Sequence, residues 1–280
     1  KDGRIVLAEA FGYAGLESGG LLTADTPMRV QSISKPVTAW GVFNLVEQGL
    51  IDLDASVEGY PKDFSLPPSD FPTEEIAIRP LLSHTTSLPL GDVFAIYSPT
   101  DKMPSLQEKL TQEAVLVRRP GTAFSYSNTG YNLLELPIEE LTGSDFAEYI
   151  EAEVLQPLGM GNASSNWSAS MAPAPPTGYA LDRRPVSTYV YPERASGGLF
   201  ATAEDIARVL VANMGENPVL SWDSLGLMYT TASDLIGIYG LGFDAYGLGH
   251  YLETLPNGVL SVSHGGQGSG IMTHFQAVPE

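Results

Sequence analysis

The stretch QSISKPVTAW, residues 31–40, contains one of only five lysines in a chain of 280 residues. Lys35 follows Ser32 by three positions, and residues at i and i+3 share one face of a helix. Pro36 has no backbone N–H, so it belongs in or near a first turn, and the helix is expected to begin close to Ser32. The apolar run VTAWGVFNLV that follows predicts a buried helix over residues 32–47.

A serine and a lysine on one helical face can form an activated nucleophile. Burial disfavours the charged form of Lys35 and moves it toward being a usable base for the Ser32 hydroxyl. At a helix start the backbone N–H of Ser32 has no intrahelical partner and can stabilise an oxyanion. The alternative is a surface lysine beside a capping serine, because Ser-x-x-Lys alone is a weak signal.

The second candidate motif is FSYSNTGY, residues 124–131. A loop tyrosine near a cationic lysine is expected to lose its proton more easily, so Tyr126 can shuttle a proton. Asn128 can orient the lysine and a substrate amide through both of its polar side-chain atoms. A rival match, Ser164-x-Asn166, lies in a serine-rich loop with no helix or strand to fix it.

The third candidate motif is SHGGQGSG, residues 263–270. His264 is expected to end a strand, and Gly265 and Gly266 would let a substrate backbone lie along that strand edge. A histidine here is a donor that can be charged or neutral near pH 7. The alternative is that the glycines simply form a turn.

Composition excludes several functional classes. Fourteen Lys and Arg against 33 Asp and Glu give a net charge of −19, which disfavours nucleic acid and anionic membranes as partners. The absence of cysteine excludes disulfides, thiolate catalysis and Cys-ligated metals. No apolar run is long enough for a transmembrane helix, and no signal peptide is visible.

The remaining patterns predict an order of elements along the chain. A strand is expected over residues 3–14, loops over 52–80 and 161–195, mostly short helices over 81–159, a helix over 202–214 capped by Thr202, and a final strand, glycine turn and strand. Strands at both chain ends predict a sheet assembled from distant segments, with a helical insertion beside it.

Ser-x-x-Lys, Tyr-x-Asn and His-Gly-Gly occur in this order, and the whole chain resembles the serine β-lactamase and penicillin-binding protein superfamily. Within it the chain is most similar to class C β-lactamases, D-alanyl-D-alanine carboxypeptidases, D-aminopeptidases and family VIII esterases. Flanking segments agree, namely LLSHTTSLP (81–89), PGTAFSYSN (120–128), PLGM (157–160) and ASGGLFATAEDIARVL (195–210).

The resemblance implies an α+β fold, with a mostly antiparallel sheet flanked by helices and an all-helical subdomain. Residues 1–56 and 187–280 are expected to form the sheet subdomain and residues 57–186 the helical one, with the active site between them. Family members usually have further elements before KDGRIV and after AVPE, so the chain is expected to be part of a longer protein. The resemblance favours a periplasmic or extracellular location, with a cytoplasmic location as the alternative.

The chain also departs from the family pattern. Ser87 stands where glycine is usual, and His-Gly-Gly replaces the Lys-Thr-Gly motif of the β-lactamases. Gly265 has no hydroxyl and His264 is a weaker, pH-dependent charge, so a substrate carboxylate loses its usual anchor. This favours esters, amides or peptides without a free carboxylate over β-lactams.

The resemblance and the motifs together predict a serine hydrolase that needs no metal or other cofactor and forms an acyl-enzyme with a small ester, peptide or β-lactam. Ser32 would attack the carbonyl, and Lys35 and Tyr126 would share the base and acid roles. The predicted oxyanion hole consists of the N–H groups of Ser32 and, by analogy, Gln267. Asn128, His264, Gly265 and Gly266 are expected to position the lysine and the substrate.

Other functions remain as alternatives. They are a class C-like β-lactamase, a D-alanyl-D-alanine carboxypeptidase, an acyltransferase, and a penicillin-sensing module that is acylated without turnover. His84 is expected to be a structural histidine bonded to backbone at a helix end. The absence of Gly-x-Ser-x-Gly, phosphate-loop and His-Glu-x-x-His motifs disfavours an α/β-hydrolase, a nucleotide-binding enzyme and a zinc protease.

Overall fold

The computed structural model describes residues 4–93, 95–215, 217–235 and 238–279. Its α-helices are α1 (Ser34–Glu47), α2 (Ile78–Leu82), α3 (Leu106–Glu113), α4 (Asn128–Leu133), α5 (Glu135–Thr142), α6 (Phe146–Ile150), α7 (Ala203–Met214) and α8 (Trp222–Met228). Short 3₁₀ turns cover Gln31–Ile33, Val57–Gly59, Thr73–Glu75 and Tyr239–Leu241, and a π turn, Glu151–Leu155, extends α6. No helix in the described ranges is both long and apolar enough to cross a membrane.

The strands form three antiparallel sheets. Two of these are two-stranded, pairing β1 (Met28–Arg29) with β4 (Phe200–Ala201) and β2 (Gly178–Tyr179) with β3 (Pro185–Val186). The main sheet has the order β5 (Ser233–Asp234), β6 (Ala245–Tyr246), β7 (Tyr251–Thr254), β8 (Leu260–Gly268) and β9 (Ile271–Ala277). Its longest ladder joins β8 to β9, with His264 opposite Phe275 and Gln267 opposite Met272.

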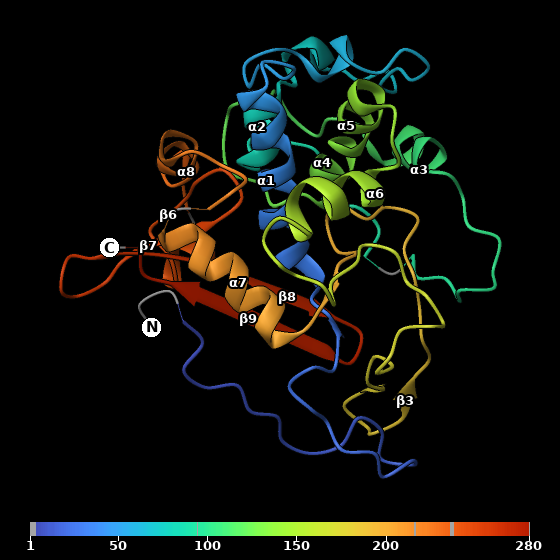
Figure 1. Cartoon of the computed structure of the whole chain (residues 1–280). Coiled ribbons are helices and arrows are strands. Elements are labelled where there is room, and N and C mark those ends of the chain that lie inside the picture. The colour runs from blue at the N-terminus through green and yellow to red at the C-terminus, as the bar shows by residue number, and fades with distance from the viewer. Residues whose placement is uncertain (1–3, 94, 216, 236–237, 280) are drawn as a thin grey trace.

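Helix α1 lies at the centre of the molecule (Figure 1). It is apolar on nearly every side, as is typical of a buried helix, and Trp40 and Phe43 are completely enclosed. It begins after the 3₁₀ turn at Gln31–Ile33 and ends before Gly49, which has a positive φ of 70°. The predicted helix over residues 32–47 is therefore confirmed.

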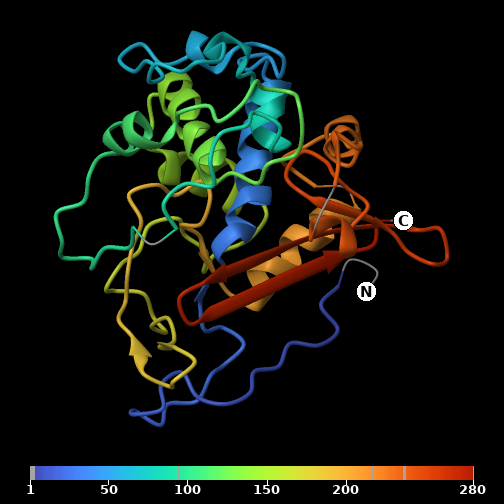
Figure 2. The ribbon, with the colours of Figure 1, turned by 180° about the vertical axis from the view of Figure 1, so that it is seen from behind.

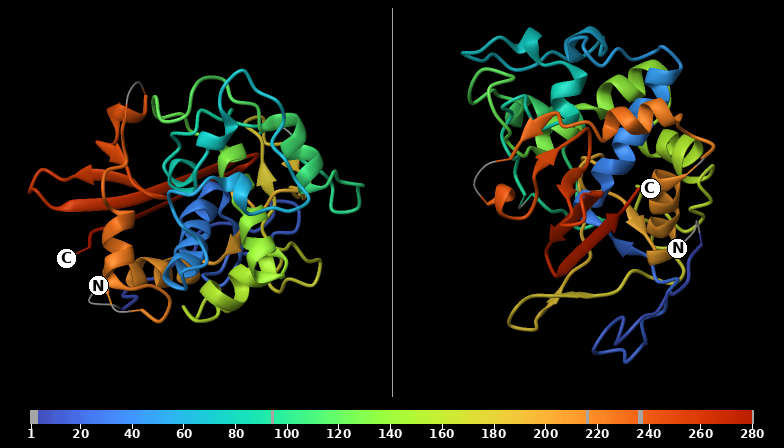
Figure 3. Two further views of the ribbon diagram at one scale, coloured as in Figure 1. Left: turned by 90° about the horizontal axis from the view of Figure 1, so that it is seen from above. Right: turned by 90° about the vertical axis from the view of Figure 1, so that its left-hand side faces the viewer.

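Helices α3 to α6 gather on one side of α1, and the main sheet and the short helix α8 lie on the other, as the view from above shows (Figure 3). Helix α7 covers one face of the β8–β9 hairpin, which is seen from its other side in Figure 2. Thr202 caps α7 and Asp205 completes a capping box, so this prediction is also confirmed. The mixed arrangement of helices and antiparallel strands agrees with the expected fold class.

The expected N-terminal strand is wrong. Its first residue, Gly3, lies outside the described residues, and the part from 4 to 14 contains a single bridge, between Tyr13 and Leu21. Val6, Leu7 and Phe11 are more than two-thirds exposed, and the segment runs along the edge of the molecule (Figure 2). Alternating apolar residues form a strand only where a neighbouring strand supplies hydrogen bonds, and here the main sheet is built entirely from residues 233–277.

The expected turn after His264 is also wrong, because residues 264–267 lie inside β8 and the turn comes at residues 269–270. The glycines serve close packing instead. A Cβ on Gly266 would clash with the carbonyl oxygen of Val30, and one on Gly268 would clash with the side chain of Gln31. Glycine therefore lets β8 lie directly against the turn that carries Ser32.

Ser87, which replaces the usual glycine, has a φ of 64°. This left-handed conformation costs a residue with a Cβ about 1–2 kcal/mol. Its hydroxyl donates to the Arg119 carbonyl (3.2 Å) and accepts from Nε of Arg118 (3.1 Å). Two hydrogen bonds of about 1 kcal/mol each offset the strain, which explains how serine is tolerated.

Arg194 anchors the segment that runs past the start of α1. Its guanidinium contacts Asp145 at 2.7 Å, Glu139 at 3.2 Å and the fully buried Glu135 at 3.6 Å. Glu135 also accepts hydrogen bonds from the backbone N–H groups of Arg194 and Ala195. Burial raises the pKa of Glu135 to about 7, although Arg194 pulls it down.

We expect Arg194→Ala to lower the free energy of unfolding by about 3–5 kcal/mol at pH 8, because it leaves a buried carboxylate unpaired. The cost should shrink toward pH 5.5, where Glu135 takes up a proton in the folded state. Urea unfolding of the native protein and the variant at pH 8 and pH 5.5 measures this difference in the free energy of unfolding. Arg208→Ala, at an exposed position on α7, is the matched control, and an equal cost at both pH values would contradict the explanation.

Candidate active site

Ser32 lies in the 3₁₀ turn before α1, and Lys35 lies in the first turn of the helix. The Lys35 Nζ atom is 3.1 Å from the Ser32 Oγ atom. Gln31, just before the serine, has a φ of 54° and is buried. Its amide bonds to the hydroxyls of Tyr189 (2.7 Å) and Tyr191 (3.3 Å), which hold the strained turn in place.

Lys35 is fully buried, and burial lowers its pKa well below the ordinary lysine value. Its Nζ atom also contacts the Oδ1 atom of Asn128 at 2.8 Å and the carbonyl oxygen of Ser196 at 2.9 Å. Both of these oxygens only accept hydrogen bonds, so they take the two N–H groups of a neutral amine. In the neutral form of Lys35 the lone pair would be left for the Ser32 hydroxyl, as a general base requires.

Tyr126 packs its ring against Lys35, with the Nζ atom 4.8 Å from the ring centre, and it hydrogen-bonds to Ser32. The expectation that Tyr126 loses its proton more easily is wrong. Burial raises its pKa, which outweighs the hydrogen bond to Ser32. Tyr126 is therefore a neutral phenol, able to pass a proton on but not to remain deprotonated.

His84 holds the Tyr126 loop from behind. It is fully buried after α2, accepts the backbone N–H of Ser127 on Nδ1 (3.1 Å) and packs against Tyr126 with ring centres 4.3 Å apart. Its predicted place, bonded to backbone at a helix end, is confirmed. Asn166, which belongs to the alternative motif Ser164-x-Asn166, instead accepts a hydrogen bond from Arg194 (3.3 Å) and does not contact Lys35 in the described structure.

His264 differs from its expected role as a substrate anchor. It is 1% exposed, with Nε2 3.2 Å from the Tyr246 hydroxyl and Nδ1 2.7 Å from the Gly265 carbonyl. Burial lowers its pKa well below the usual value, so the ring is neutral at pH 7. A side chain enclosed in the sheet offers no charge to a substrate carboxylate.

This neutral state can be measured. We expect the His264 imidazole NMR signals to stay constant between pH 6 and 8, whereas an exposed imidazole titrates near 6.5. The signals are assigned with the His264→Gln variant. A midpoint between 6 and 7 would contradict the buried, neutral ring and restore the charged anchor.

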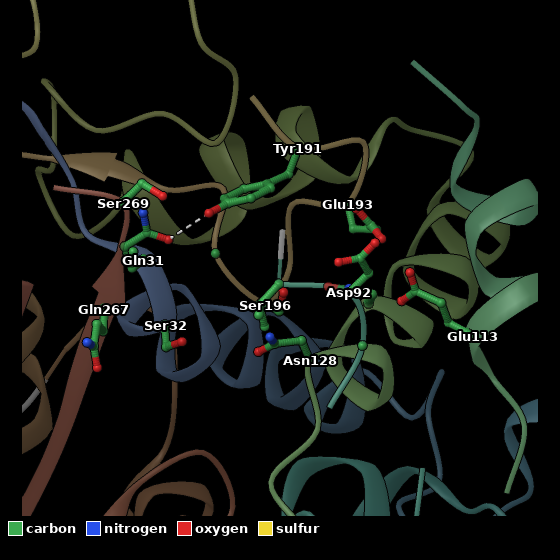
Figure 4. Close-up of a pocket in the computed structure, with 15 residues that line it drawn as sticks. Gln31, Ser32, Asp92, Glu113, Asn128, Tyr191, Glu193, Ser196, Gln267 and Ser269 are labelled. Atoms are coloured by element: carbon green, nitrogen blue, oxygen red, sulfur yellow. Dashed lines mark hydrogen bonds between the residues drawn. The ribbon is translucent and has the colours of Figure 1, made fainter. Parts of the chain in front are cut away.

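A cavity of about 410 Å³ opens beside Ser32. Figure 4 shows Gln267 and Ser32 on one side of it, with Asn128 and Ser196 between them and a group of acidic residues. Gln267 is exposed on β8, and its use as the second oxyanion donor stays a prediction. Gly265 and Gly266 do not line this cavity in the described structure.

Comparison with known protein families matches residues 1–280 to the family described as Beta-lactamase. The chain belongs to the β-lactamase family. Penicillin-binding protein 4* of Bacillus subtilis (strain 168) is 31% identical over 203 residues, which cover 69% of this chain and 43% of that protein. The chain thus spans less than half the length of this relative.

Solved structures of the family show the same fold. The octameric penicillin-binding protein homologue from Pyrococcus abyssi superposes with a TM-score of 0.82 at 28% identity, covering 100% of this chain and 65% of that one. A penicillin-binding protein from Bacillus halodurans gives 0.80 at 24% identity, covering 97% and 83%. The resemblance and the fold class predicted from the motifs are therefore confirmed.

Within this β-lactamase-family site, sequence reasoning missed four kinds of contribution. These are the strained Gln31, the Tyr189 and Tyr191 hydroxyls that hold it, the Ser196 carbonyl on Lys35, and the acidic side of the cavity formed by Asp92, Glu113 and Glu193. Only the segment ASGG (195–198) carried a signal, as part of the family resemblance. A carbonyl oxygen and scattered acids leave no spacing pattern in a sequence.

Proposed function

We propose that this chain is a serine hydrolase that forms an acyl-enzyme on Ser32 with ester or peptide-amide substrates. The observation that carries the proposal is the state of Lys35. It is buried, no carboxylate within the described residues pairs with it, and two oxygen acceptors bind its N–H groups. These contacts support a neutral amine facing the Ser32 hydroxyl.

In the proposed reaction the Ser32 Oγ atom attacks the substrate carbonyl carbon while its proton moves to the Lys35 Nζ atom. The oxyanion is stabilised by the Ser32 and Gln267 N–H groups. The bond to the leaving alcohol or amine then breaks, and Tyr126 passes the proton to the leaving atom. Water then attacks the acyl carbon while its proton moves to Lys35. The bond to the Ser32 Oγ atom breaks, the proton returns from Lys35 to Oγ, and the acid is released.

The absent carboxylate anchor favours neutral esters and amides over β-lactams. Gly265 has no hydroxyl and His264 is neutral and enclosed, whereas a hydrogen bond to a charged group is worth about 1.5–3 kcal/mol. A second candidate is favoured by a relative named for penicillin binding. In this second candidate function, Ser32 is acylated by β-lactams. The acyl-enzyme is then either hydrolysed, as in a β-lactamase, or retained, as in a sensing module.

A substrate panel separates these functions. We expect a short-chain p-nitrophenyl ester to be hydrolysed with a kcat/KM roughly tenfold or more above that of a chromogenic cephalosporin, from the loss of one charged hydrogen bond. Cephalosporin turnover exceeding every ester would favour the β-lactamase. A stoichiometric burst on both substrates without turnover would favour the sensing module.

A further inference from the structure

Two further cavities, of about 150 and 250 Å³, share Arg29, Trp167 and Phe200 among their lining residues. We call this pair of cavities the Arg29 chamber. Tyr191 lines both the larger of the two and the cavity beside Ser32, so the two spaces are neighbours. Ser32 itself is not among the described residues that line the chamber. The chamber is therefore separate from the candidate active site.

Arg29, on β1, places a buried positive charge in the chamber, since its side chain is part of a residue only 4% exposed. Its Cζ atom lies over three aromatic rings, at 4.3 Å from the ring centre of Phe200, 4.7 Å from that of Tyr189 and 5.2 Å from that of Tyr191. Aromatic rings attract the faces of a guanidinium. They leave its N–H groups, which point outward in the guanidinium plane, without acceptors.

These N–H groups are largely unpartnered. Nη2 donates to the carbonyl of Tyr189, which is the only hydrogen bond of the Arg29 side chain within the described residues. No carboxylate in the described part of the chain pairs with Arg29, whereas Arg194, which also lines the larger cavity, contacts three carboxylates. Burial lowers the pKa of Arg29, and no acidic residue among those described offsets this effect. A buried cation without a counter-ion is unfavourable, and a bound anion would supply the missing charge.

The walls of the chamber indicate what kind of anion fits. Neither cavity has an aspartate or glutamate among its described lining residues, although the chain carries a net charge of −19. Apolar side chains line both cavities, namely Met171, Pro176 and Ile271 in the smaller and Met103 and Pro192 in the larger. An arginine binds a carboxylate through two parallel hydrogen bonds, and apolar walls favour an apolar body on the same ligand.

We propose that the Arg29 chamber is a binding site for a small organic carboxylate with an aromatic or aliphatic body. The carboxylate accepts hydrogen bonds from the free N–H groups of Arg29, and the body packs against Trp167 and the apolar walls. The inference does not rest on the proposed hydrolase function, because neither Ser32 nor Lys35 is among the described residues that line the chamber.

Phenylacetate and phenylacetamide test the charge requirement, because they share a shape and only the first is an anion. By isothermal titration calorimetry at pH 7 and low salt, we expect phenylacetate to bind with a Kd roughly 10- to 100-fold lower. The preference should fall at high salt, since the charges are screened. Equal affinities, or no binding of either compound, would overturn the inference and leave Arg29 stabilised by its aromatic rings alone. Chloride binding as tightly as phenylacetate would replace the organic carboxylate by a simple anion.

Variants assign the binding to the chamber. Arg29→Gln should raise the Kd of phenylacetate at least tenfold and remove the preference over phenylacetamide. Arg208→Gln, at an exposed position outside the chamber lining, is the matched control and should bind like the native protein. An unchanged Kd in Arg29→Gln would overturn the assignment.

Tryptophan fluorescence gives a second readout, which decides if Arg29→Gln does not fold. Of the three tryptophans in the chain, only Trp167 is among the described residues that line the chamber. The change in fluorescence on adding phenylacetate should be lost in Trp167→Phe and kept in Trp222→Phe, at an exposed position on α8. A response that is kept in Trp167→Phe would place the ligand elsewhere and reject the chamber as its site.

Discussion

Ser32→Ala should abolish hydrolysis, with a loss on the order of 10⁶-fold in kcat, as expected when a nucleophile that forms a covalent intermediate is removed. The free energy of unfolding should change by less than about 1 kcal/mol, because Ser32 is only partly buried and the change removes a small hydroxyl that contacts Lys35. Ester turnover and urea unfolding are measured on the same preparation.

A fluorophosphonate probe tests the same assignment directly. Mass spectrometry should place the adduct on Ser32 in the native protein and find none in Ser32→Ala. Ser170→Ala, at an exposed serine that is not among the described residues lining the cavity, is the control and should be labelled and active like the native protein. An adduct on another serine would reject Ser32 as the nucleophile.

Lys35→Met should lower kcat/KM for an ester by about 10²–10⁴, the usual contribution of a general base. The side chain is matched in size and is enclosed, so the change removes the amine while keeping the packing. In the native enzyme the acid limb of the pH–rate profile should lie well below the lysine value of 10.5, because burial lowers the pKa of Lys35.

Lys102→Met, an exposed lysine, is the matched control and should retain full activity. Tyr126→Phe should also lower kcat/KM by about 10²–10⁴-fold. The loss should be larger for amides than for reactive p-nitrophenyl esters, because the leaving group of these esters needs no proton. Near-native turnover by Lys35→Met would exclude the proposed mechanism.

Local patterns predicted α1, α7 and the final hairpin because each depends on interactions between near neighbours. Helix α1 is marked by Pro36 near its start, by the apolar run along its length and by Gly49 after its end. Helix α7 begins at the cap formed by Thr202 and Asp205. The same method failed for residues 4–14, whose alternation resembles a strand. Such a segment forms a strand only where a neighbouring strand offers free backbone hydrogen-bonding groups, and a local sequence pattern contains no information about that neighbour.

The glycines of β8 illustrate a second limit. A run of Gly265, Gly266 and Gly268 is typical of a turn, yet it lies within a strand. The reason is the approach of Val30 and Gln31, more than 230 positions earlier in the chain, to positions where a Cβ would clash. The sequence correctly singled out these glycines, but their role in close packing could be recognised only once the position of the distant segment was known.

The sequence by itself determined the nucleophile candidate, its lysine, the tyrosine and asparagine that meet them, and the family to which the chain belongs. Only the tertiary structure decided the protonation states and the shape of the cavity. Distant segments exclude water from both side chains, which lowers the pKa of Lys35 and of His264 well below their ordinary values. The acidic side of the cavity, formed by Asp92, Glu113 and Glu193, likewise brings together residues about 100 positions apart. Solvent exclusion and charge proximity are properties of the folded chain, and spacing along the sequence does not encode them.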